Sequence, residues 1–187
     1  MDICPLHDRQ KLRYEKRINM DIKIRHEKSE DIDVITRLTK AAFQNQEHSS
    51  HTEQYIISAL RRAGQLKISL VATESGEIIG HVAVSPVVLS SGATDWYGLG
   101  PISVWPDRQG RGIGSTLVKA VLAELQRLGA AGCVVLGSPD YYGRFGFESH
   151  PDLRLPGVPH EYFQAICFEG ELPADIVKYH EAFEATE

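Results

Sequence analysis

The stretch VWPDRQGRGIGS, residues 104–115, decides the fold of this chain. An apolar run, 101–104, leads into a Pro-Asp turn and a loop that contains three glycines. Beyond the loop, apolar residues recur at intervals of three and four, which is typical of one face of an α-helix. These residues are Ile113, Leu117, Val118, Val121, Leu122, Leu125 and Leu128. Gly129 follows as a helix stop, so the pattern predicts a strand, a glycine loop and a helix.

A helix whose first turn is rich in glycine exposes backbone N–H groups that have no partner within the helix. Glycine has no Cβ that would hold a ligand away from these groups, and the positive end of the helix dipole attracts anions. Arg108 and Arg111 add full positive charges at the same point. The loop is therefore predicted to bind an anion such as a pyrophosphate.

The spacing of the glycines excludes two other phosphate-binding loops. A Walker A loop has Lys and then Ser or Thr after its last glycine, but Ser115 and Thr116 follow Gly114 directly. A Rossmann fingerprint has its third glycine one position later and an acidic residue at the end of the next strand. The next predicted strand, 131–136, is followed instead by Gly137.

The spacing Gln/Arg-x-x-Gly-x-Gly/Ala is met by Gln109, Gly112 and Gly114, and it closely resembles the acetyl-coenzyme A signature of the GNAT N-acetyltransferase superfamily. A glycine-rich turn without a ligand is the alternative interpretation of this motif alone. Further along, SPDYYGRFGF at 138–147 predicts a short helix with Ser138 as its N-cap and a new strand near its end. This run resembles the tyrosine-bearing helix of the same superfamily.

The resemblance implies that one tyrosine lies beside the coenzyme sulfur. Tyr142 is the residue that aligns with the family's tyrosine, and it is therefore the predicted catalytic residue. Its neighbour Tyr141 is expected to pack against the protein. An aromatic cluster that fills the core is the alternative for both side chains.

The remaining elements follow the GNAT order over residues 20 to 180, and strands 67–73 and 77–89 are predicted to meet in a hairpin at Ser75 and Gly76. Helices are predicted at 31–44 and 52–62, and further strands at 21–26, 95–104, 131–136, 162–168 and 176–180. The resemblance implies an α+β fold with a mixed, mostly antiparallel central sheet and helices on both faces. GHVAVSP at 80–86 and KYHEAF at 178–183 also resemble the bacterial YhbS-like branch.

The resemblance further implies acetyl-CoA as co-substrate and assigns it a set of residues. The end of the strand before the loop would polarise the thioester carbonyl, with the Val104 amide as the donor, while the loop holds the pyrophosphate. The implied coenzyme-binding residues are Ile102, Ser103, Val104, Gln109, Gly110, Arg111, Gly112, Ile113, Gly114 and Ser115. Pro101 and Pro106 cannot donate ladder hydrogen bonds, which suits a strand that separates from its neighbour here.

The general base stays unassigned from sequence. Many GNAT members carry a glutamate on the strand that enters the loop, but residues 96–104 contain no carboxylate and Asp95 lies too early to align. His81 on the preceding strand has a suitable pKa, although a strand histidine is more often structural. Glu53 on the second helix lies near the expected acceptor cleft.

The expected activity is transfer of the acetyl group from acetyl-CoA to an amine, by direct attack in a ternary complex. Two alternatives remain open: a catalytically idle acyl-CoA-binding sensor, and an acyltransferase that uses another acyl group or acceptor. The acceptor is expected to be a small-molecule or peptide amine. A homodimer is possible from the resemblance.

The composition favours a single domain and argues against several classes of protein. The chain has 187 residues, 42% hydrophobic and 24% charged, which is enough for one core. A net charge of −5 argues against a nucleic-acid binder. Three cysteines, two of them in apolar runs, favour reduced thiols in the cytoplasm. No membrane span or secretory signal is expected from the sequence, and neither is a metal cofactor.

Residues 1–19 differ from the rest and precede a second methionine, Met20. They combine a basic cluster with Cys4 and His7 and are predicted to form a flexible leader, with the GNAT domain occupying 20–187. A metal site at Cys4 and His7 lacks a second pair of ligands, which makes it a weak hypothesis.

Overall fold

The computed structural model describes residues 22–46 and 49–187, so the predicted leader lies outside the described residues. Its helices and strands are β1 (Lys23–His26), α2 (Ile32–Phe43), α3 (Glu53–Arg62), β2 (Ile68–Glu74), β3 (Glu77–Pro86), β4 (Val88–Leu89), β5 (Trp96–Val104), α4 (Ile113–Arg127), β6 (Gly132–Leu136), α5 (Pro139–Tyr142), β7 (Leu153–Arg154), β8 (Phe163–Cys167) and β9 (Asp175–Lys178). Short 3-10 turns lie at Ser29–Asp31, Pro106–Arg108, Gly143–Phe145, His160–Tyr162 and Glu181–Glu184.

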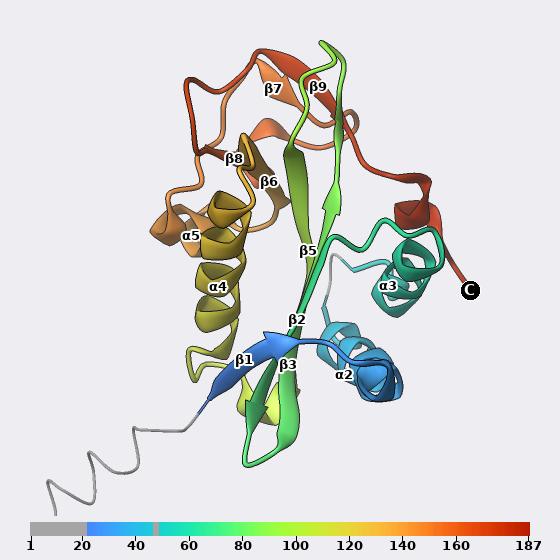
Figure 1. The fold of residues 1–187 in the computed structure, drawn as a ribbon. Helices are drawn as coiled ribbons and strands as arrows, with labels where there is room; N and C mark the ends of the chain where they lie inside the picture. The colour runs from blue at the N-terminus through green and yellow to red at the C-terminus, as the bar shows by residue number, and fades with distance from the viewer. Residues whose placement is uncertain (1–21, 47–48) are drawn as a thin grey trace, which may run out of the picture.

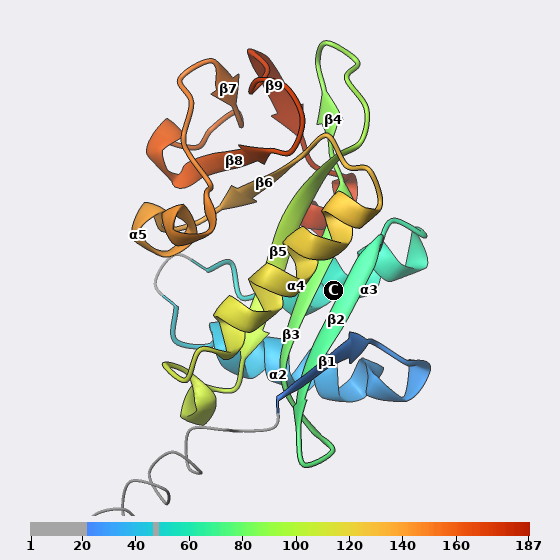
Figure 2. The same cartoon turned by 60° about the vertical axis from the view of Figure 1, so that its left-hand side comes forward.

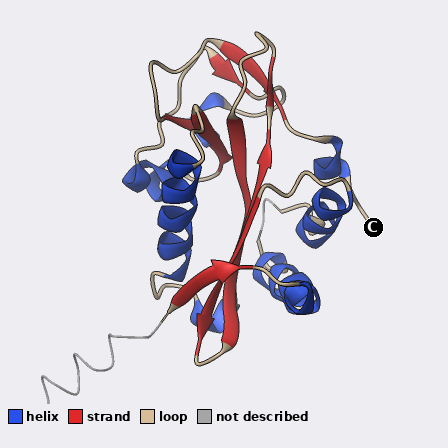
Figure 3. Cartoon of the chain, viewed as in Figure 1, coloured by secondary structure: helices blue, strands red, loops and turns tan. Residues whose placement is uncertain are grey.

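A six-stranded sheet in the order β1-β2-β3-β5-β6-β8 forms the centre of the molecule. Only the β5–β6 pair is parallel, and every other neighbouring pair is antiparallel. Helix α4 covers one face, and α2 and α3 cover the other (Figures 1 and 3). The predicted α+β architecture, with a mixed and mostly antiparallel sheet between helices, is confirmed.

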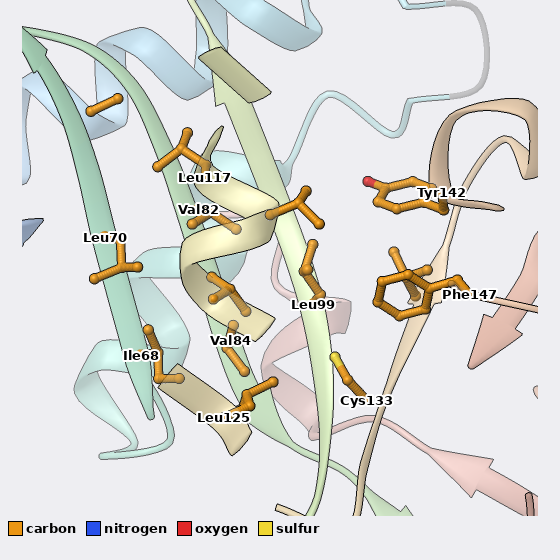
Figure 4. Close-up of a cluster of buried hydrophobic side chains, with 14 of the residues drawn as sticks. Ile68, Leu70, Val82, Val84, Leu99, Leu117, Leu125, Cys133, Tyr142 and Phe147 are labelled. Carbon is orange, nitrogen blue, oxygen red and sulfur yellow. The ribbon is translucent and has the colours of Figure 1, made fainter. Parts of the chain in front are cut away.

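The main core fills the space between α4 and the sheet. Alternate residues of β2 and β3, such as Leu70 and Val82, point toward the fully buried Leu117 and Leu125 of α4 (Figure 4). This is the face that the helical spacing predicts. Leu128 departs from it with 43% of its surface exposed, because it lies at the C-cap, beyond the last helical residue.

The turn residues adopt the backbone conformations that their sequence predicts. Ser75 and Gly76 have φ values of 52° and 87°, as a tight hairpin of this handedness requires. Gly129 has a φ of 73° and ends α4. The first turn joins β2 to β3, and the second lies between α4 and β6.

The predicted strand 77–89 is in fact two strands. β3 ends at Pro86, whose nitrogen carries no hydrogen and cannot extend the ladder. The next strand, β4, pairs with β9 in a separate three-stranded sheet with the order β4-β9-β7. Of the two predicted closing strands, β8 joins the main sheet and β9 joins this smaller one.

The strand predicted near Phe147 is also absent from the described structure, apart from one isolated bridge between Glu148 and Ala165. Phe147 is 2% exposed and packs into the main core instead. Within the part of the chain that the structure describes, no helix is both long and apolar enough to cross a bilayer.

Candidate active site

β5 and β6 diverge at the middle of the sheet. They pair only from Trp96 to Leu99 on β5, whereas β5 continues for five more residues to Val104 (Figure 2). Beyond Leu99, β5 is therefore hydrogen-bonded to β3 on one edge and lacks β6 on the other. The predicted separation of this strand is observed.

The register of β5 shows which of its backbone groups face the gap. The Trp105 N–H donates to the Ile79 carbonyl at 3.3 Å, on the β3 side. Because successive residues of an antiparallel strand direct their N–H and C=O groups to opposite edges, Val104 and Ile102 direct theirs away from β3. The Val104 carbonyl accepts a hydrogen bond from Gln109 Nε2 at 3.2 Å. The Val104 N–H faces the edge of β5 that β6 leaves open.

Ser103 has the opposite orientation. Its backbone groups face β3, and its hydroxyl donates to Thr39 Oγ1 of α2 at 3.1 Å. The residue is 2% exposed and lies on the α2 face of the sheet. Of the three predicted residues of this strand, the structure therefore brings Ile102 and Val104 to the gap and turns Ser103 away.

The glycine loop and the start of α4 follow β5 directly. Gly110 and Gly112 have φ values of 73° and 79°, and a β-carbon on either would meet no atom within 4 Å, so the space above them is open. The first helical hydrogen bond at this end runs from the Thr116 N–H to the Gly112 carbonyl. The N–H groups of residues 113–115 precede it and are free for an anion.

The two loop arginines share one acidic partner. Arg108 contacts Glu74 at 2.8 Å and Arg111 contacts the other oxygen of the same carboxylate at 3.4 Å. Arg108 lines the cavity described next, whereas Arg111 does not. Their positive charge is therefore partly balanced by Glu74 within the protein.

A cavity of about 1460 Å³ joins the gap to the glycine loop. It is lined by Ala42, Phe43, Asn45, Gln46, Ser49, Glu53, Ile102, Val104, Arg108, Gln109, Gly110, Gly112, Ile113, Gly114, Ser115, Leu136, Gly137, Ser138, Tyr141, Arg144, Gly157, Val158, Pro159 and Tyr162. A single small-molecule site typically measures about 300–1,000 Å³. The cavity is thus large enough for two substrates.

The two adjacent tyrosines of α5 have different surroundings. The Tyr141 hydroxyl lies over the start of α4, where a β-carbon at Gly114 would be 2.6 Å from it, and Tyr141 lines the cavity. Tyr142 is 7% exposed and packs against Phe147 (Figure 4), with ring centroids 5.8 Å apart, and it does not line the cavity. Its ring lies against Gly137, where a β-carbon would be 2.3 Å from it. Burial raises the pKa of Tyr142 above its usual range, so its hydroxyl is neutral.

Of the two candidate bases, His81 and Glu53, only Glu53 lines the cavity. Asp95 is exposed at the opposite end of β5 from Val104. His81 is fully buried and shares a hydrogen bond of 2.8 Å with Ser69 through Nε2. Because Ser69 also donates to Glu27, His81 belongs to a structural network on the α3 face, as the structural alternative predicts.

The buried His81 makes the fold sensitive to acid. Burial lowers its pKa from 6.5 to about 4, so between these values the unfolded chain binds a proton that the folded chain does not. The contribution of His81 to stability is therefore constant above about pH 6.5, and it falls by up to about 3 kcal/mol as the pH drops to about 4. Urea unfolding at pH 7 and pH 4.5 measures the fall, and His81→Gln is expected to reduce it. An equal fall in the variant would contradict this origin.

Sequence reasoning missed the far wall of the cavity. Residues 157–159 and Tyr162 reach it from the segment before β8, and Arg144 lies with its guanidinium carbon 4.7 Å from the Tyr141 ring centre. Residues 157–159 and Tyr162 belong to no motif, and only the chain path places them there, whereas Arg144 lies within the run at 138–147 but has no predicted role. No group of three or more potential metal ligands occurs among residues 22–46 and 49–187, and Cys4 and His7 lie outside those ranges.

Residues 23–149 match the model of the acetyltransferase (GNAT) domain. The chain belongs to the GNAT family. It is 37% identical over 141 residues to the N-acetyltransferase YhbS of Escherichia coli K12, covering 72% of this chain and 84% of that protein. The resemblance to the YhbS-like branch is confirmed, and the chain is a GNAT-type N-acetyltransferase.

Two solved structures are similar over most of their length. A GNAT acetyltransferase from Brucella melitensis in complex with acetyl-CoA is 44% identical, with a TM-score of 0.78 over 87% of this chain and 97% of that one. E. coli YhbS in complex with CoA is 35% identical, with a TM-score of 0.78 over 89% and 93%. Both share the overall fold of this chain.

Proposed function

We propose that this N-acetyltransferase uses acetyl-CoA as its acetyl donor and transfers the acetyl group to an amine by direct attack in a ternary complex. One observation carries the proposal: the open edge of β5 and the glycine-led start of α4 line the same cavity. A thioester and a pyrophosphate can therefore be bound at once. The complexes of the two similar proteins with acetyl-CoA and CoA support this donor.

The coenzyme would be held mainly by backbone groups. The N–H groups of the loop and first helical turn take the pyrophosphate, with the side chain of Ser115 beside them. Ile102 and Val104 offer their free edge to the pantetheine arm, and the Val104 N–H polarises the thioester carbonyl. Ser103 has no part in this arrangement because it faces α2.

The reaction then needs a neutral amine. At pH 7, deprotonating an amine with a pKa of about 10.4 costs about 4.6 kcal/mol. The amine nitrogen attacks the carbonyl carbon, the C–N bond forms, and the C–S bond breaks with its electron pair leaving on sulfur. The proton lost by the amine is taken up by solvent water, and the thiolate takes a proton from solvent on release, so that an amide and free CoA thiol result. Tyr142 would donate a hydrogen bond to the sulfur as its negative charge develops.

The proposal is tested by calorimetric titration with acetyl-CoA, followed by thiol release across a broad panel of amines. Micromolar binding together with amine-dependent thiol release is expected. Binding without release would favour the idle sensor, and tighter competition by longer acyl-CoAs would favour another acyl group. Absence of acetyl-CoA binding would overturn the proposal.

A further inference from the structure

Glu53 is a buried carboxylate with an oxygen that has no partner. It is the first residue of α3 and is 8% exposed. Ser49 Oγ donates to its Oε1 at 2.7 Å, but Oε2 is buried without a hydrogen-bond partner in the described structure. A buried unpaired charge costs several kcal/mol or more. An unsatisfied buried group in a native protein needs an explanation, and a ligand that supplies the missing hydrogen bond is one.

The position of Glu53 indicates where that ligand comes from. Its side chain lines the same cavity as Val104 and the glycine loop, on the wall formed by the α2–α3 connection. An acidic residue is common in the first turn of a helix, which would explain the residue type. It does not explain why this carboxylate is buried against a cavity with one oxygen unpaired.

The charged residues that line the cavity restrict further which class of ligand fits at Glu53. Glu53 is the only carboxylate among the described residues that line it. The two lining cations are engaged elsewhere, Arg108 with Glu74 and Arg144 over the Tyr141 ring. The other described residues around the α2–α3 wall, such as Phe43 and Gln46, carry no charge. The described residues that line the cavity therefore leave Glu53 without a cationic partner.

We infer that Glu53 binds the ammonium group of the acceptor, so that this enzyme selects cationic primary amines. The inference rests on the proposed function, since it places the acceptor opposite the donor thioester in one cavity. The unpaired Oε2 accepts a charge-assisted hydrogen bond from the ammonium group. Ser49 acts as a positioning residue, because its hydroxyl donates to the other carboxylate oxygen, Oε1, and so fixes the orientation of the carboxylate.

The first test is kinetic and uses the intact chain saturated with acetyl-CoA. Glu53→Gln keeps the shape and removes the charge, and it is expected to raise KM for n-butylamine, 1,4-diaminobutane and phenethylamine at least about tenfold. The dissociation constant of acetyl-CoA stays within twofold. Asp33→Asn, the matched control, removes a carboxylate from an exposed position of α2 that does not line the cavity, and it changes KM by less than about threefold. An unchanged KM in Glu53→Gln would overturn the inference.

A second test does not depend on turnover or on the coenzyme. Chemical-shift changes in the isotope-labelled protein are followed during titration with n-butylamine at pH 7, with n-butanol as the neutral analogue. Perturbation around Glu53 by the amine alone, lost in Glu53→Gln, is expected. Equal responses to both probes, or none to the amine, would overturn the inference. Failure of acetyl-CoA to bind would instead overturn the proposed function, so the two failures are distinguishable.

Discussion

Replacing Gly112 with aspartate is expected to abolish acetyl-CoA binding, raising the dissociation constant at least about 100-fold. Gly112 is the N-cap of α4, and a β-carbon there would meet no atom within 4 Å. The new carboxylate would therefore fit sterically, lie beside the free N–H groups of the first turn, and occupy the anion site. It would also repel the pyrophosphate directly.

The matched control for this change is Gly112→Asn. Asparagine has the shape of aspartate and tolerates the left-handed conformation that the φ of 79° requires, but it carries no charge. Both variants share the same backbone strain, so the difference between them isolates the charge. Calorimetry with acetyl-CoA is expected to show binding by the asparagine variant within about tenfold of the parent chain. Equal affinities of the two variants would show that the loop does not hold the pyrophosphate.

The glycine loop could be predicted from sequence because its chemistry is local. Glycines at positive φ, the helical spacing after them and the prolines around β5 each act within a few residues. The separation of β5 from β6 agrees with the same local features, since Pro101 lies just past the last β5–β6 pair and has no N–H to donate, and Pro106 lies just beyond the end of β5. The fold class followed because these segments occur in the GNAT order.

The rest depends on contacts between distant segments, which no local pattern records. Ser103 is turned toward α2 because one residue of register decides which face a strand residue occupies. Tyr141 and Tyr142 are adjacent in sequence, yet one lines the cavity and the other packs into the core. The unpaired oxygen of Glu53 becomes visible only when the α2–α3 connection is placed against the cavity.

Tyr142→Phe is expected to lower turnover on the order of 100-fold while acetyl-CoA affinity stays within about twofold. No hydrogen bond of the Tyr142 hydroxyl occurs among the described residues, so its loss is expected to cost the fold little. Full proton transfer to a thiolate is uphill by about 2 kcal/mol from reference pKa values of about 10 and 8.5. The raised pKa of the buried Tyr142 makes this proton transfer still more unfavourable.

A hydrogen bond that strengthens as sulfur gains charge is therefore the role that Tyr142 can fill. Because Tyr141 lines the cavity with its hydroxyl over Gly114, Tyr141→Phe is the necessary comparison. We expect it to change acetyl-CoA affinity more than turnover, since its hydroxyl lies at the anion end of the cavity. Steady-state rates with thiol detection and calorimetry on both variants separate the two effects. If turnover collapses in Tyr141→Phe and survives in Tyr142→Phe, the catalytic role belongs to Tyr141 instead.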